Sequence, residues 1–349
     1  MNKFQFIEVN GDTHFELGLQ YGRQAKEKIL AGIEHYRRRF IETSSMSLEE
    51  VYNYARAYLP VVEQRLPEIA MEAKGIAEGA SVSIDDIMML NCRYEITKFP
   101  RPQECTSYAV LPGATKNGDM LFGQNWDYCA GIMDNIVVVH MTDKDGNRIL
   151  GVTEAGQLVR HGMNSYGVGL ATNNLQSIYD NKIIELPTCF LRRKVLDCKT
   201  FAEATSLIHD SARAVSCNYL VASKDGRAVD YEAYPGGVDT IEPQGDILTH
   251  ANHFVIHPEL HALRRSFRDQ RLFTLIMTRY GAVNEEYLKL CLSDHVNFPK
   301  SVCAHPEDVL VPVERREVTV ASEIYNMTLG EAQVCYGPPC CGAFTTYKL

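Results

Sequence analysis

The spacing of apolar residues divides the chain into an N-terminal part with helical periodicity and a longer part with strand periodicity. Up to about Ile96, apolar side chains recur at the spacing that is typical of amphipathic helices. Two of these helices are predicted to begin at capping boxes, formed by Ser47 with Glu50 and by Ser83 with Asp86. Gly18 and Gly22 would let another element approach the first helix closely.

The second part is predicted to be rich in antiparallel strands. Short apolar segments are joined at Asp145-Gly146 and at Asp225-Gly226, which are signals for tight hairpins. The strands predicted in this part are 108–115, 119–123, 136–141, 148–153, 218–222, 228–231, 318–327 and 333–336, and the helices are 186–196, 200–209 and 260–280. Because tight turns imply antiparallel sheets, whose outer faces the helices must cover, we predict an α+β fold.

A short linker separates the two parts. Pro100 and Pro102 interrupt regular backbone hydrogen bonding between residues 97 and 104. We therefore divide the chain into a helical leader, 1–104, and a strand-rich region, 105–349. A peptide bond at the end of this linker would be accessible to cleavage.

Cys105 is the first residue after the linker and heads a predicted strand. If the bond before it were cut, the thiol would stand next to its own α-amino group. A free thiol titrates near ~8.5 and an α-amino group near ~7.7–8.0, so at neutral pH the amine is partly unprotonated and can take the thiol's proton. An internal cysteine would need a histidine instead.

A turn signal places a carboxylate near this cysteine. Asn117-Gly118 predicts a two-residue hairpin. Cys105 lies twelve residues before Asn117, and Asp127 lies nine residues after Gly118, so both fall at the same end of the ribbon. Asp127 is predicted to orient Cys105 once that residue has become a new N-terminus.

Several segments resemble a known family. They are Cys-Thr-Ser at 105–107, Gly-Gln-Asn-Trp-Asp at 123–127, Asn-Ser-Tyr-Gly-Val-Gly-Leu at 164–170, Gly-Ile-Ala-Glu-Gly at 75–79 and Leu-Asn-Cys-Arg at 90–93. Over nearly the whole chain, the sequence resembles the acyl-coenzyme A:6-aminopenicillanic acid acyltransferases. These are N-terminal nucleophile (Ntn) hydrolases and are more distantly similar to bile-salt hydrolases. The resemblance implies a four-layer α-β-β-α sandwich.

The resemblance also implies a reaction. The chain would cut itself between Glu104 and Cys105, and Cys105 would then be the nucleophile that hydrolyses or transfers the acyl group of a small-molecule amide or thioester. Asp127 would lie near the new amine. No metal and no diffusible cofactor are expected to take part.

Other site residues follow from the same resemblance. Asn252 would hold the oxyanion, and Arg316 would be the active-site arginine, or Arg315 if the alignment shifts by one residue. Asn174 and Tyr108 are expected to bind substrate.

Two alternative functions stay open. Glu104 places a carboxylate beside the scissile carbonyl, which disfavours thiolate formation, so an uncut, non-catalytic binding protein of the same fold is one alternative. The other is a conventional cysteine or zinc hydrolase. His253 would be the base of a Cys-His pair, and His250, His253, His257 and His261 recur at a helical spacing suited to zinc. Pro258 disfavours a continuous helix, so no metal site is predicted there.

Composition argues against other classes of protein, such as nucleic-acid-binding and membrane-spanning proteins. With 45% hydrophobic and 23% charged residues among 349, the chain can bury a large core. A net charge of -9 leaves no basic face for nucleic acid. No segment is apolar and long enough for a membrane span, and no secretory core follows the first residues, so a cytoplasmic location is expected. The oligomeric state stays open, with a homo-oligomer among the alternatives.

The eleven cysteines lack the compact spacing of a disulfide framework and are predicted to be mostly free thiols. Cys335, Cys340 and Cys341 surround Gly337-Pro338-Pro339. Because no histidine lies near them in sequence, they are predicted to be surface-turn cysteines rather than metal ligands.

Overall fold

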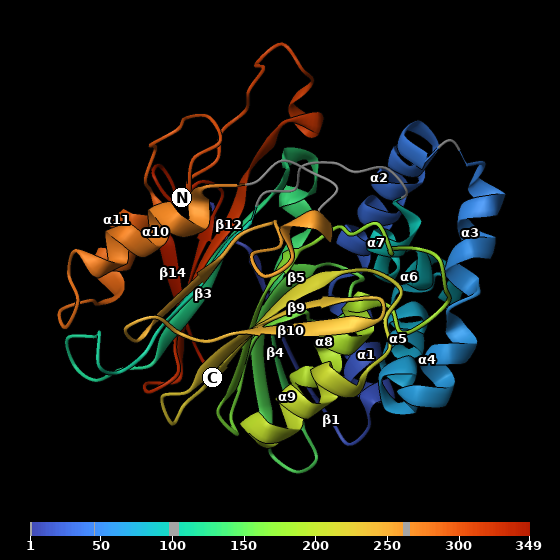
Figure 1. Cartoon of the computed structure of the whole chain (residues 1–349). Helices are drawn as coiled ribbons and strands as arrows, with labels where there is room; N and C mark the ends of the chain where they lie inside the picture. The colour runs from blue at the N-terminus through green and yellow to red at the C-terminus, as the bar shows by residue number, and fades with distance from the viewer. Residues whose placement is uncertain (1, 45, 98–104, 261–265) are drawn as a thin grey trace.

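Two β-sheets form the centre of the molecule, and helices cover the outer face of each (Figure 1). The structure is a computed structural model that describes residues 2–44, 46–97, 105–260 and 266–349. The eight-stranded sheet has the order β1 (Gln5–Gly11), β4 (Ile136–Asp143), β5 (Arg148–Glu154), β6 (His161–Asn164), β7 (Val168–Asn174), β8 (Cys217–Ser223), β9 (Ala228–Tyr234) and β10 (Gly237–Ile241). The six-stranded sheet has the order β11 (Ile247–His250), β2 (Thr106–Val110), β3 (Leu121–Cys129), β12 (Glu317–Asn326), β13 (Glu331–Tyr336) and β14 (Phe344–Lys348).

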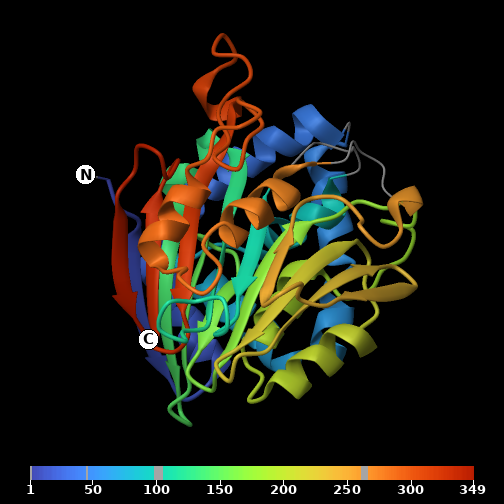
Figure 2. The same cartoon turned by 60° about the vertical axis from the view of Figure 1, so that its left-hand side comes forward.

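The helices form two outer layers. Those on the side of the eight-stranded sheet are α1 (His14–Gln24), α2 (Lys26–Ser44), α3 (Leu48–Arg56), α4 (Leu59–Arg65), α5 (Pro67–Ala80), α6 (Ile84–Asn91), α7 (Arg93–Ile96), α8 (Thr188–Val195) and α9 (Phe201–Asp210). On the other side, α10 (Arg268–Met277) and α11 (Glu285–Leu292), drawn in orange in Figure 2, pack on the six-stranded sheet. This arrangement confirms the α+β class and the α-β-β-α order of layers.

Strand β1 was not predicted. It pairs in parallel with β4, with Gln5 opposite Val137, whereas the other strand pairs in the described residues are antiparallel. A strand this short gives a weak periodic signal, and its partner lies more than a hundred residues away in sequence. Residues from both sides of position 104 contribute to one hydrophobic core, so the leader packs as part of the same body.

The predicted Asn117-Gly118 hairpin is a longer connection. β2 ends at Val110 instead of continuing to residue 115, because Pro112 cannot donate to a strand ladder. β3 begins at Leu121 and continues to Cys129, past the predicted end at residue 123. The register still pairs Thr106 with Asn125, so Cys105 and Asp127 do lie at the same end of the strand pair, as predicted.

The close approach predicted at the first helix is confirmed. A Cβ on Gly18 would lie 2.1 Å from the main-chain oxygen of Glu72 in α5, and one on Gly75 would lie 2.2 Å from that of Phe15 in α1. Both predicted capping boxes are also present, at the starts of α3 and α6.

The predicted helix over 260–280 is shorter in the structure. Residues 258–260 form a 3-10 turn, residues 261–265 lie outside the described residues, and α10 covers Arg268 to Met277. The Asp-Gly turns between β4 and β5 and between β8 and β9 are as predicted, with φ of +79° at Gly146 and +89° at Gly226. Within the described residues, none of the helices combines the length and apolar character needed to cross a bilayer.

Candidate active site

Cys105 stands directly before β2, on the side of the six-stranded sheet that faces the other sheet. Alternate residues of β2 point to opposite faces. Ser107 accepts a hydrogen bond from the Nδ2 of Asn173 in β7 at 2.9 Å, which identifies the inner face. The Cys105 thiol lies on the same side, with its Sγ 3.8 Å from the main-chain oxygen of Asp127. Glu104, the predicted processing residue, lies outside the described residues.

The environment of Cys105 keeps its thiol protonated. Burial raises the pKa of Cys105 to about 12, and the nearby Asp127 carboxylate acts in the same direction. Arg160 and Arg268 partly oppose this effect. A thiol with such a pKa is almost entirely un-ionised at neutral pH, so Cys105 is a weak nucleophile while it remains an internal residue.

Asp127 is fixed at the end of β3 by two buried partners. Its Oδ2 accepts a hydrogen bond from the Nη1 of Arg268 at 2.9 Å, and its Oδ1 accepts one from the Thr319 hydroxyl at 2.6 Å. Thr319 stands opposite Asp127 in β12, just before a register shift, and its hydroxyl also accepts the Ala304 N–H at 2.9 Å. Continuing the β2–β3 register by one residue puts Cys105 opposite Trp126, so Asp127 stands one residue beyond it, and the charge of Asp127 acts on the Cys105 thiol.

Asn252 lies just after the strand that pairs with β2. β11 pairs with β2 so that His250 lies opposite Ser107, and Asn252 follows two residues later in the bend after β11. The Asn252 Nδ2 donates to the main-chain oxygen of Asn174, at the end of β7, at 2.8 Å. A side-chain amide carries two N–H groups, so this bond leaves one for a ligand.

Arg316 lines a cavity next to Asp127. The cavity has a volume of about 200 Å³, and its lining includes Asp127, Arg268, Ala304 and Arg316. The guanidinium of Arg316 donates to the main-chain oxygens of Val309 and Val311, the latter at 2.8 Å. The guanidinium shown to pair with Asp127 is that of Arg268.

Tyr108 is not brought to this site. It points to the outer face of β2, where it packs with residues of α10 and α11, and its hydroxyl donates to the main-chain oxygen of Glu323 at 3.2 Å. Period-two alternation explains this placement, because residues 105 and 107 face inward and residue 108 therefore faces outward. Tyr108 therefore lies on the face of β2 opposite the Cys105 thiol, and its role in substrate binding stays a prediction.

The predicted histidine stripe is divided among different local structures. His250 ends β11 and bonds the Oε1 of Glu232 at 2.8 Å, His253 lies in the following bend with its Nε2 3.8 Å from Asp269, and His257 lies beside Glu259. His261 lies outside the described residues. His250, His253 and His257 each lie near a different carboxylate, and they do not share one helical face.

Sequence reasoning missed Arg268 and Arg160 as site residues. Arg268 is the first residue of α10, and only the packing of that helix over the end of β3 directs it to Asp127. Arg160 is buried with its guanidinium 4.2 Å from the centre of the Trp126 ring. Neither residue lies in a segment with a local signal that distinguishes it from the other arginines.

The fold defines the structural class of the protein: an α-β-β-α sandwich in which two largely antiparallel sheets lie between helical layers (Figure 1). The family model for acyl-coenzyme A:6-aminopenicillanic acid acyl-transferase matches residues 114–339. The chain belongs to this family, which confirms the resemblance of the sequence motifs.

Known relatives can be described by their similarity to this chain. The acyl-coenzyme A:6-aminopenicillanic-acid-acyltransferase 40 kDa form of Emericella nidulans is 26% identical over 298 residues, covering 83% of this chain and 82% of that protein. Among solved structures, a variant of the conjugated bile acid hydrolase from Clostridium perfringens is 15% identical with a TM-score of 0.49, covering 70% of this chain and 97% of that one. Penicillin V acylase from Agrobacterium tumefaciens is 13% identical with a TM-score of 0.47, covering 66% of this chain and 83% of that one.

Proposed function

We propose that the protein is a self-processing cysteine amidohydrolase or acyltransferase that is cut between Glu104 and Cys105. The observation that carries this proposal is the combination of a Cys105 thiol pKa near 12 with the nearby Asp127 carboxylate, which Arg268 holds in place. The thiol is poorly activated as part of an intact chain. Cleavage would give it an adjacent amine, and Asp127 would hold that amine in place.

The proposed cut proceeds through the chain's own sulfur. The Cys105 thiol adds to the carbonyl carbon of Glu104, the C–N bond breaks as the C–S bond forms, and the thiol proton passes to the departing nitrogen. Water then opens the thioester and leaves a free carboxyl group on Glu104. The products would be the segments 1–104 and 105–349, which stay together because they share one core.

The same atoms then act on substrate. The free amine of Cys105 takes the thiol proton, and the sulfur attacks the carbonyl of a small-molecule acyl amide or acyl thioester. Asn252 holds the main-chain oxygen of Asn174 through its Nδ2, and its remaining N–H would donate to the developing oxyanion. The amine proton passes to the leaving group, and water or an acceptor amine then takes the acyl group from the sulfur.

Asn174 and Arg316 have supporting roles in this proposal. Asn174 fixes Asn252 through its main-chain oxygen, so its role is to position the oxyanion donor. Arg316 lines the cavity beside Asp127, where it can contact substrate. The relative from Emericella nidulans is named an acyltransferase, which supports transfer to an amine as one of the reactions to test.

Intact mass and N-terminal sequencing test the proposal. The wild-type protein is expected to yield two segments, the second beginning at Cys105, and Cys105→Ala is expected to remain a single chain. The mature protein is then assayed against N-acyl amino acids, penicillins and bile-salt conjugates. His253→Ala serves as the control and is expected to mature and turn over substrate normally, whereas a conventional Cys-His enzyme would lose activity. Full turnover by an intact chain would falsify the proposal.

A further inference from the structure

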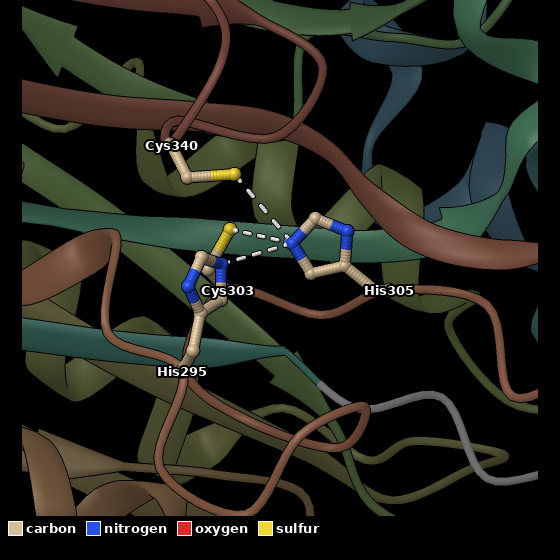
Figure 3. Close-up of side chains that lie close together, drawn as sticks. All are labelled: His295, Cys303, His305 and Cys340. Carbon is tan, nitrogen blue, oxygen red and sulfur yellow. Dashed lines mark hydrogen bonds between the residues drawn. The ribbon is translucent and has the colours of Figure 1, made fainter.

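Four metal-ligating side chains converge beside the active site. His295, Cys303, His305 and Cys340 each offer one ligand atom, and these atoms all lie within 4.8 Å of one another (Figure 3). The first three come from the loop that follows α11, and Cys340 comes from the connection between β13 and β14. The sequence analysis treated Cys340 as a surface-turn cysteine for lack of a nearby histidine, but the fold supplies two histidines from a distant segment.

The arrangement around His305 calls for a shared partner. Its Nε2 lies 3.0 Å from the Nε2 of His295, 3.5 Å from the Sγ of Cys303 and 3.5 Å from the Sγ of Cys340. A ring nitrogen has either one N–H or one lone pair, so it cannot make three good hydrogen bonds at once. A cation placed among the four atoms would satisfy all of them together.

We propose that His295, Cys303, His305 and Cys340 form a structural zinc site. Zinc binds cysteine sulfur at about 2.3 Å and histidine nitrogen at about 2.0–2.1 Å, usually with tetrahedral geometry. Such geometry separates a sulfur ligand from a nitrogen ligand by about 3.6 Å, which agrees with both sulfur–nitrogen distances measured here. Two sulfur and two nitrogen ligands also favour zinc over the oxygen-preferring magnesium and calcium ions.

The ligand set is complete, which indicates a structural role. Catalytic zinc sites keep one position for water or substrate, whereas structural sites have four protein ligands. Cys303 is buried and His305 is half-buried, so two of the four ligand side chains are shielded from solvent.

The loop that carries three of the ligands also supports the active site. Ala304 donates to Thr319, which holds Asp127, and the main-chain oxygen of Val302 accepts the Nδ2 of Asn125 at 2.8 Å. Ala304 and His305 also line the cavity beside Asp127. Zinc would therefore join the β13–β14 connection to the loop that fixes the active-site carboxylate.

Metal analysis of the whole protein tests the site. Protein produced with zinc present and purified without chelators is expected to hold close to one zinc ion per chain by plasma mass spectrometry. Cys303→Ser and Cys340→Ser are expected to lose this zinc. Cys341→Ser is the matched control, because Cys341 is the exposed neighbour of Cys340 and its thiol contacts the main-chain oxygen of Pro338 at 3.6 Å.

A second measurement uses only the wild-type protein and so does not depend on the folding of variants. Iodoacetamide labelling with peptide mapping is expected to spare Cys303 and Cys340 in the zinc-loaded protein and to label both after chelation. Replacement of zinc by cobalt is expected to give the visible absorption of a tetrahedral site with thiolate ligands. Zinc-incubated wild type without stoichiometric metal would overturn the proposal, as would a Cys303–Cys340 disulfide in that protein, or equal zinc loss in Cys341→Ser.

Discussion

At the scale of single residues, the candidate active site depends on how one carboxylate is held. Asp127 is buried, and an unpaired buried carboxylate is strongly disfavoured. Arg268 supplies the opposite charge and Thr319 supplies a hydroxyl donor, each to a different oxygen of the carboxylate. The carboxylate is therefore fixed in one orientation before any substrate or free amine is present.

Replacing Arg268 with methionine tests this dependence. Arg268→Met removes the guanidinium that pairs with the buried Asp127, and breaking a buried ion pair typically lowers the free energy of unfolding by about 3–5 kcal/mol. We also expect slower processing and a lower kcat. The control is Arg271→Met, one turn along α10, where the arginine pairs with the partly exposed Asp294 at 2.6 Å and is expected to contribute less than about 1 kcal/mol.

Urea unfolding and the rate of appearance of the 105–349 segment measure the two effects. Arg268→Lys should recover part of the processing rate, because lysine restores the positive charge but lacks the planar guanidinium of arginine. Equal behaviour of Arg268→Met and Arg271→Met would show that Asp127 does not depend on Arg268.

The sequence could predict part of this site. Cys105 and Asp127 could be predicted to lie near each other because they belong to the ends of one strand pair. The register keeps these ends together even though the connection at Asn117-Gly118 is longer than the predicted two-residue turn. Asn252 was predicted from the family motif, and its role stays a prediction. Arg268 was not predictable, because its role depends on how α10 packs across the sheet.

At the scale of elements, the contact between α1 and α5 is set by glycine. Gly18 and Gly22 of α1 face backbone atoms of α5, and Gly75 and Gly79 of α5 face backbone atoms of α1. The two helices therefore approach so closely that a side chain at any of these positions would meet main-chain atoms. The sequence showed the glycines of α1, but it could not show which helix lies against them.

Gly75→Ala is predicted to destabilise the protein. The new Cβ would lie 2.2 Å from the main-chain oxygen of Phe15, so the helices would have to separate. Overpacking of this kind typically costs about 1–3 kcal/mol. Gly32→Ala in α2 is the control, because its Cβ would meet nothing closer than 3.7 Å.

At position 32, the higher helix propensity of alanine should stabilise the Gly32→Ala protein by up to about 1 kcal/mol. Thermal unfolding followed by circular dichroism compares the two variants. A Gly75→Ala protein as stable as wild type would mean that the α1–α5 contact can adjust.

At the scale of the whole molecule, the leader and the strand-rich region are joined by buried charge as well as by apolar packing. Glu72 in α5 accepts hydrogen bonds from His14 in α1 at 2.8 Å and from the Nε of Arg193 in α8 at 2.9 Å. Glu72 and Arg193 lie on opposite sides of position 104. Long-range contacts of this kind leave no periodic signal, which is why the sequence could not show how closely its two predicted parts pack together.

This buried pair predicts a dependence of stability on acid. Burial alone would raise the pKa of Glu72, but Arg193 and His14 outweigh it and hold the pKa at about 2, below the usual 4.5. Because the folded-state pKa is lowered, the contribution to stability is complete above about pH 4.5 and is lost as the pH falls toward 2. A shift of this size corresponds to about 3 kcal/mol.

Urea unfolding of the wild type and of Glu72→Gln between pH 7 and pH 3 measures this contribution. The variant is expected to be less stable at pH 7 and to lose less stability on acidification, because glutamine does not titrate. Glu68→Gln, one turn earlier in α5, is the control: Glu68 is exposed and pairs with Lys194 at 3.2 Å, so its loss should leave the pH dependence nearly unchanged. If Glu72→Gln and wild type lost stability in parallel, the acid sensitivity would have to come from other carboxylates, and the Glu72–Arg193 pair would not hold the leader to the rest of the protein.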